Sequence, residues 1–188
     1  MILNNKISGG QLDQSIVNDV VGVSGFGFYV NDTGTQTITS TASKLVIDGA
    51  GTTSTSAYLP LEIRGSGDEL WDSLNNKITP IAVGDSYLAR MDLEITSKAG
   101  SPTELTLGLD ISPTTTILQK TIVATKSTPF SLSITFNFFS LSTFVSNGGE
   151  LFLETNTGTL TVSKRQLLIH RISSGQISLP SQIPLPLL

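Results

Sequence analysis

The chain has 188 residues, no cysteine and few charges: charged residues make up 14% of the sequence and the formal net charge is −4. The missing cysteine excludes disulfides, thiolate metal sites and a cysteine nucleophile. The basic residues are scattered rather than gathered into a stripe that could neutralise phosphates, so nucleic acid is not an expected partner. The length fits a single domain that can bury a hydrophobic core without disulfide cross-links.

We expect residues 1–24 to form an N-terminal arm. The first residues lack the basic start and following apolar run of a signal peptide, and no stretch of the chain is as long and apolar as a membrane span. We therefore expect a protein made in the cytoplasm that has no membrane partner. Within the arm, residues 11–21 carry apolar side chains at helical spacing, which fits a short helix or an extended segment equally well.

Residues 25–173 are expected to form one all-β domain, because apolar side chains recur there at every second position. The clearest example is the Phe-rich stretch 130–138, and residues 87–95 and 105–111 repeat the pattern. Further candidate strands are 27–30, 35–39, 44–48, 58–64, 150–154, 159–163 and 166–172. About eight to ten short strands separated by Asn, Asp and Gly turns, without helical crossovers, predict an antiparallel jelly-roll sandwich.

Two of these strands carry large apolar side chains on successive positions, in Leu151–Leu153 and Leu167–Ile169. Each must therefore present an apolar group on the outer face of a sheet. An outer face is normally wet unless something covers it. Association into a closed ring of identical subunits is the favoured explanation, and cover by a loop or the N-terminal arm of the same chain is the alternative.

No pattern of catalytic residues stands out, and we expect a non-enzymatic protein with no cofactor and no metal. His170 is the only histidine, and no nucleophile elbow or alternating set of oxygen ligands is present in the sequence. Trp71 lies beside the acidic residues Asp68, Glu69 and Asp72, so it could stack on a sugar. The other interpretation is a tryptophan that caps one end of the sandwich.

Five segments in order resemble a known family: Phe28–Asp32, Trp71–Ile78, Val83–Tyr87, the Phe-rich strand 130–138, and Ser146–Leu153. They are similar to the trimeric tumour-necrosis-factor-like (TNF-like) jelly rolls of tailed phages, found in capsid cement or decoration proteins, head fibres and tail-spike tips. The resemblance spans residues 25–173 and rests on the order of strands and turns rather than on a catalytic signature.

This resemblance implies a homotrimer whose Phe-rich and C-terminal strands lie near the three-fold axis, and it transfers no catalytic residue. The residues expected at the trimer interface are Phe136, Phe138, Phe152, Leu168 and His170.

Residues 174–188 are expected to form a Pro-rich C-terminal arm. Pro180, Pro184 and Pro186 alternate with Ile and Leu, which favours an extended segment with projecting apolar side chains and no core of its own. Such a segment is expected to dock on a neighbouring subunit or on a capsid protein, and the alternative is a frayed tail. The arm residues expected to bind are Ile2, Leu3, Ile177, Leu179, Ile183, Leu185 and Leu187.

Together these features favour a trimeric cement or decoration protein that clamps the major capsid protein at the capsid surface of a virion. The alternative hypothesis is a receptor- or carbohydrate-binding tip of a head or tail fibre. The two differ in the role of the arms, which only the first needs for its binding.

Overall fold

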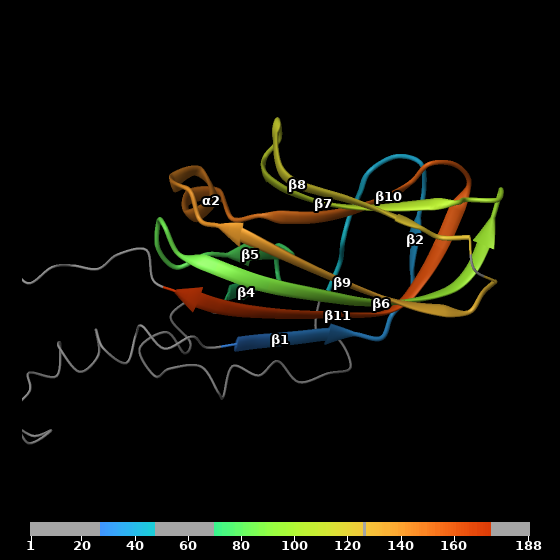
Figure 1. Ribbon diagram of the computed structural model, residues 1–188, viewed down its shortest axis with the longest axis horizontal. Coiled ribbons are helices and arrows are strands. Elements are labelled where there is room, and N and C mark those ends of the chain that lie inside the picture. The colour runs from blue at the N-terminus through green and yellow to red at the C-terminus, as the bar shows by residue number, and fades with distance from the viewer. Residues whose placement is uncertain (1–26, 48–69, 126, 174–188) are drawn as a thin grey trace, which may run out of the picture.

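The computed structural model describes residues 27–47, 70–125 and 127–173, which form two antiparallel sheets packed face to face (Figure 1). Sheet A contains, in spatial order, β1 (Gly27–Asp32), β11 (Thr159–Ser173), β6 (Ser86–Ala99) and β9 (Phe130–Phe139), and β2 (Gln36–Ile38) also pairs with β11. Sheet B contains β3 (Ser43–Lys44), β10 (Glu150–Thr155), β7 (Glu104–Ser112) and β8 (Thr115–Val123). A hairpin of β4 (Leu70–Asp72) and β5 (Lys77–Thr79) and the helix α2 (Ser142–Asn147) lie at one end. This confirms the predicted antiparallel jelly-roll sandwich.

The core lies between the sheets and follows the period of two in the sequence. On β6 the side chains of Tyr87, Ala89, Met91, Leu93 and Ile95 are buried while their neighbours are more exposed. An aromatic cluster closes the α2 end of the core, because the Phe138 ring lies 5.1 Å from Tyr87 and 5.3 Å from Phe144, centroid to centroid. Such contacts bring the two sheets and the helix into one packed interior.

A buried ion pair closes the side of the sandwich where the chain crosses from sheet A to sheet B. The side chains of Arg165 on β11 and Asp32 on β1 are each 3% exposed, and Arg165 Nη2 lies 3.0 Å from Asp32 Oδ1. The guanidinium also donates from Nε to the Val46 carbonyl (2.7 Å) and from Nη1 to the Gly34 carbonyl (3.0 Å). Burial of an ion pair requires such additional hydrogen bonds, since both groups lose their water. We call this edge the closed side.

Several elements differ from those predicted. Residues 159–173 form one long strand rather than two, and register shifts mark the places where β11 bends along β6. The strands β4, β5 and β8 and the helix α2 were not predicted. The candidate helix 11–21, the candidate strand 58–64 and both arms lie outside the described residues. Within the described part of the chain, no helix has the length and apolar character needed to cross a membrane.

Candidate interaction surface

The outer face of sheet A is apolar at one end. Cross-strand registers place Tyr29 beside Leu168, and His170 beside Leu88. The next positions along the strands bring Phe139 beside Ser86, which also pairs with Ser173. Three side chains of this group are well exposed: Leu88 (38%), Ile172 (53%) and Phe139 (67%). We call this group the outer patch, and it consists of Tyr29, Leu88, Phe139, Leu168, His170 and Ile172.

The structure divides the five residues predicted for the trimer interface. Phe136 and Phe138 are each 5% exposed and point into the core of their own subunit, so they are removed from the candidate interface. The physical reason is the alternation itself, because both share the inward face of β9 with the buried Ile134. Leu168 and His170 do lie on the outer patch. The His170 ring sits against Gly27, where a Cβ would come within 2.5 Å of Nε2.

Phe152 lies on a different surface, because β10 belongs to sheet B. It pairs with Gly108 on β7, and its ring covers that glycine so closely that an added Cβ would lie 2.0 Å from Cζ. Part of the outward apolar surface of β10 is thus covered within the same chain. Phe152 cannot share one contiguous patch with Leu168 and His170, which face outward from the opposite sheet.

The other half of the outer face of sheet A is polar. Arg90 Nε lies 3.0 Å from Asp92 Oδ2 on the same strand. Asp92 and Glu94 line a shallow groove of about 310 Å³ together with Lys164 from β11. The face therefore combines an apolar end with a charged end.

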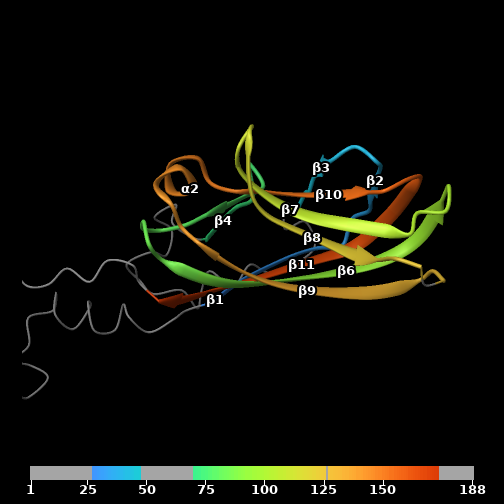
Figure 2. The same ribbon diagram turned by 45° about the horizontal axis from the view of Figure 1, so that its top comes forward.

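The side opposite the closed side is open, and Figure 2 shows the strands that border it, β8 in sheet B and β9 in sheet A. Several apolar side chains here pack against the core and stay partly exposed. We call this group the open seam, and it consists of Ile117, Leu118, Ile122, Phe130 and Leu132. Lys120 on β8 crosses the seam and donates from Nζ to the Thr135 carbonyl on β9 at 3.2 Å.

A buried polar cluster fixes the end of β11, beside the outer patch. Arg171 contacts the fully buried Asp85 through Nε–Oδ2 (2.9 Å) and Nη2–Oδ1 (3.0 Å). The Tyr87 hydroxyl donates to Asp85 Oδ2 and accepts from the Ile81 N–H, both at 3.0 Å. Burial, with a smaller effect of the Asp85 charge, raises the pKa of Tyr87 far above its usual value. The tyrosine therefore acts as a neutral hydrogen-bonding group at all ordinary pH values.

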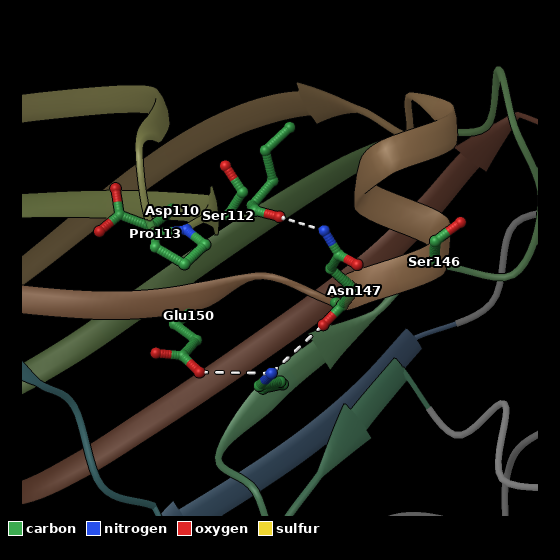
Figure 3. Close-up of a pocket in the computed structure, with 9 residues that line it drawn as sticks. Asp110, Ser112, Pro113, Ser146, Asn147 and Glu150 are labelled. Atoms are coloured by element: carbon green, nitrogen blue, oxygen red, sulfur yellow. Dashed lines mark hydrogen bonds and ion pairs between the residues drawn. The ribbon is translucent and has the colours of Figure 1, made fainter.

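A polar pocket of about 590 Å³ lies between α2, β7 and β10 (Figure 3). Lys77 Nζ lies 3.3 Å from both Glu150 Oε1 and the Asn147 carbonyl, and Asn147 Nδ2 donates to the Ile111 carbonyl at 3.2 Å. Hydrogen bonding to Lys44, together with the nearby Lys77, lowers the pKa of Glu150. These contacts tie the helix end to sheet B and to the β4–β5 hairpin, and they place no nucleophile beside a base.

Trp71 caps the sandwich, as one of the two sequence interpretations holds. It is 4% exposed, and its Nε1 donates to the Ile47 carbonyl at 3.0 Å. A ring buried in this way has no face available for stacking on a sugar. The neighbouring Asp72 organises a turn by accepting from Asn75, which lowers the pKa of Asp72. Asp68 and Glu69 lie outside the described residues, and the described part of the chain contains no group of three metal-binding side chains.

No protein-family model and no curated protein matches the chain. Among solved structures, an Eiger TNF from S. frugiperda is similar at 14% identity and a TM-score of 0.47, with 85% of this chain and 98% of that chain covered. The PRD1 vertex protein P5 follows at 12% identity and a TM-score of 0.42, covering 81% and 99%. The BFDV capsid protein has 12% identity and a TM-score of 0.33, covering 85% and 98%.

Proposed function

We propose that this chain is a non-enzymatic structural protein of a virion, which associates with copies of itself into a closed trimer and decorates the capsid shell. The finer part of the proposal is a cement role, in which residues 1–24 and 174–188 dock on the major capsid protein. The sequence resemblance to phage jelly rolls suggests this setting, and surface features of the subunit support it.

The observation that carries the proposal is the outer patch and its position. Gly27, where β1 begins, pairs with His170 of the patch, and Ser173, where β11 ends, pairs with Ser86 beside Phe139. Both terminal segments are therefore joined to the domain at the end of sheet A that carries the patch (Figure 1). A subunit that docks through its patch brings both arms to the same contact.

The second support is that the outer patch and the open seam are different surfaces. The patch covers the outer face of sheet A, whereas the seam runs along the edges of β8 and β9. A contact between two unlike surfaces is heterologous, and repetition of it closes a ring where the rotation between neighbours closes. Two unlike surfaces favour a cyclic ring over a two-fold dimer, in which one surface would have to pair with itself, and the resemblance to trimeric jelly rolls sets the expected number at three.

The test is a pelleting experiment with capsids stripped of their decoration protein. The intact chain, a variant lacking residues 1–24 and a variant lacking residues 174–188 are mixed with the particles, and the bound fraction is measured after sedimentation. We expect the intact chain to be retained and at least one truncated form to be lost. The oligomeric state of each form is measured alone by sedimentation velocity, so that lost binding can be separated from lost assembly.

Two outcomes would contradict the proposal. Failure of the intact, trimeric chain to pellet would reject the cement role and favour the tip of a head or tail fibre. A chain that is still monomeric at about 10 µM would reject the closed ring. A dissociation constant of about 10 µM corresponds to an association free energy near 7 kcal/mol.

A further inference from the structure

The open edge of β9 has the properties of a strand that another chain can extend. Among the strands that the structure describes, β9 pairs only with β6, over ten residues and without a register shift. Its sequence FSLSITFNFF contains no charge and no proline. Proteins usually blunt such an edge with charges, prolines or bulges, because its unpaired backbone groups otherwise pair with another chain.

The direction of the backbone groups on β9 follows from its C-terminal end. The Ser140 N–H donates to the Asp85 carbonyl at 2.9 Å, and the Ser140 carbonyl accepts from Gly84 at 2.7 Å. Even-numbered residues of β9 therefore direct their N–H and C=O groups toward β6, and odd-numbered residues direct theirs toward the open edge. The bond from Lys120 to the Thr135 carbonyl agrees with this assignment.

Side chains alternate with the same period, and this fixes what a new strand beside β9 would meet. The even-numbered side chains, from Phe130 to Phe138, face the core, and the odd-numbered ones face outward. At the edge, Phe130 and Leu132 are only half-buried and belong to the open seam with three side chains of β8. A new strand with apolar side chains on the core face would complete the burial of this seam.

Residues 176–188 have a sequence suited to such a strand. All three prolines, Pro180, Pro184 and Pro186, stand at even positions, so an extended segment keeps every N–H on its odd-numbered side. The same odd-numbered positions carry all five Ile and Leu residues that precede Leu188: Ile177, Leu179, Ile183, Leu185 and Leu187. In an extended conformation, the odd-numbered edge of this segment can therefore form a continuous ladder of backbone hydrogen bonds. One face of the segment is apolar, and the other face carries Ser, Gln and Pro.

We infer that residues 177–187 add to sheet A as a strand parallel to β9. In an antiparallel ladder, odd residues of the segment would lie opposite odd residues of β9, and the apolar side chains would face outward. In a parallel ladder, odd residues lie opposite even residues of β9, and the apolar side chains face the open seam. Burial of apolar surface therefore selects the parallel arrangement.

The parallel arrangement requires the strand of a neighbouring copy. The strand β11 ends at Ser173, beside Ser86, and Ser86 lies beside Phe139 at the last residue of β9. A parallel strand must start near Phe130, about 30 Å away along β9. The four residues from Ser173 to Ile177 span at most about 14 Å. The segment thus joins two subunits. This inference rests on the self-association part of the proposed function, and it assigns residues 177–187 to a neighbouring copy and leaves docking on the capsid protein to residues 1–24.

A matched pair of proline substitutions tests the ladder in the full-length chain. Ser181→Pro removes an N–H on the side that faces β9, and Gln182→Pro removes one on the side that faces away; neither removes an apolar side chain. We expect Ser181→Pro to weaken self-association by a factor of about 3 to 10, the value of one backbone hydrogen bond, and Gln182→Pro to leave it unchanged. Sedimentation equilibrium measures both. Equal effects of the two substitutions would overturn the inference.

Disulfide trapping tests direction and partner, because the chain has no native cysteine. One tagged copy carries Ser133→Cys on the outward face of β9, and a second copy with another tag carries one cysteine at a position from 178 to 185. After co-expression and mild oxidation, we expect mixed-tag dimers from even positions only, since these share the outward face in a parallel ladder. Dimers from odd positions only would show an antiparallel strand and overturn the inference.

A single chain carrying both Ser133→Cys and Gln182→Cys distinguishes exchange from folding back. We expect linked oligomers on a non-reducing gel, and a monomer with an internal disulfide would overturn the exchange. These experiments contain no capsids, so they separate the two proposals. Trapped dimers without particle binding would reject the cement role alone, and particle binding without trapped dimers would reject this inference alone.

Discussion

The two sides of the sandwich are closed by opposite means. On the closed side, Arg165 and Asp32 are buried to 3% exposure and the guanidinium also binds two backbone carbonyls. On the open side, the exposed Lys120 bridges the two sheets, and apolar side chains of β8 and β9 stay half-buried. The first edge is completed within the subunit, whereas the second, among the residues that the structure describes, has strand edges without a further strand and apolar side chains that are only half-buried.

This difference separates stability from assembly. A buried charge is costly unless all its partners are present, so the closed side should tolerate almost no change. Exposed groups contribute little to the folding of one subunit, so the open side and the outer patch should tolerate change and still affect association. Substitutions placed on each side can break or sharpen this comparison.

The largest effect is expected from Arg165→Ala on the closed side. It leaves the Asp32 carboxylate buried without its cation and should lower the free energy of unfolding by about 3 to 5 kcal/mol. Lys120→Ala on the open side removes one exposed contact and should cost no more than about 1 kcal/mol. Urea denaturation followed by circular dichroism measures both. Similar costs for the two variants would refute the contrast between the sides.

The next largest effect on the free energy of unfolding concerns Tyr87 and Asp85. Like Arg165 and Asp32, they form a buried hydrogen-bonded group around a charge, here at the end of sheet A that carries the outer patch. Tyr87→Phe removes two hydrogen bonds to the hydroxyl and should cost about 1 to 3 kcal/mol at neutral pH, because the Asp85 charge loses a donor. The folded-state pKa of Tyr87 is raised above its unfolded value near 10, so its contribution to stability is complete below about pH 10 and declines as the pH rises above that.

Tyr87→Phe should therefore unfold with a weaker dependence on pH above 10 than the parent chain. Tyr29→Phe, on the outward face of β1, serves as the control for removal of a tyrosine from a less buried place. An unchanged alkaline profile in Tyr87→Phe would show that Tyr87 is not the group whose ionisation opposes the fold.

The alternation of apolar side chains was enough to predict the sandwich, because it shows which side chains of each strand face the core. A shift by one residue would place all of these apolar side chains on the solvent face. The alternation also contained information that the choice of interface residues did not use. Phe136 and Phe138 share the parity of Ile134 and so belong to the core, whereas Phe139 breaks the parity and lies outside. The doublet of two phenylalanines was the signal that one of them must face solvent or a partner.

Other features depend on cross-strand register, which one sequence does not reveal. Phe152 is covered through its pairing with Gly108, over forty positions earlier in the chain, and Arg165 meets Asp32 from the far end of the domain. The strand β8 was missed for a different reason. As an edge strand it is exposed at most positions, so its sequence TTILQKTIV lacks the regular alternation that a half-buried strand shows.

A smaller effect on folding, with a larger effect on assembly, is expected for Phe139→Ser in the outer patch. The side chain is 67% exposed, so the free energy of unfolding of one subunit should change by no more than about 0.5 kcal/mol. Self-association should weaken if the patch is covered in the trimer. Asn137→Ser, on the same face of β9, is the matched control. Unchanged association in Phe139→Ser would remove the patch from the interface.

The effect most easily removed by salt is expected for Glu150→Gln, which compares an exposed ion cluster with the buried pair of the closed side. Glu150 Oε1 lies 2.8 Å from Lys44 Nζ and 3.3 Å from Lys77 Nζ, but the side chain is 40% exposed and solvent screens both contacts. Loss of the charge should cost about 0.3 to 1 kcal/mol, and added salt should reduce this cost.

The pH dependence of the same substitution separates charge from packing. The folded-state pKa of Glu150 is lowered, so its contribution is present above the unfolded value of about 4.3 and is lost as the pH falls below it. The difference in unfolding free energy between the parent chain and Glu150→Gln should therefore shrink from pH 7 to pH 3. A difference that persists at pH 3 and in 1 M salt would mean that Glu150 stabilises the pocket by packing, and that exposed and buried charges in this sandwich are not as unlike as their burial implies.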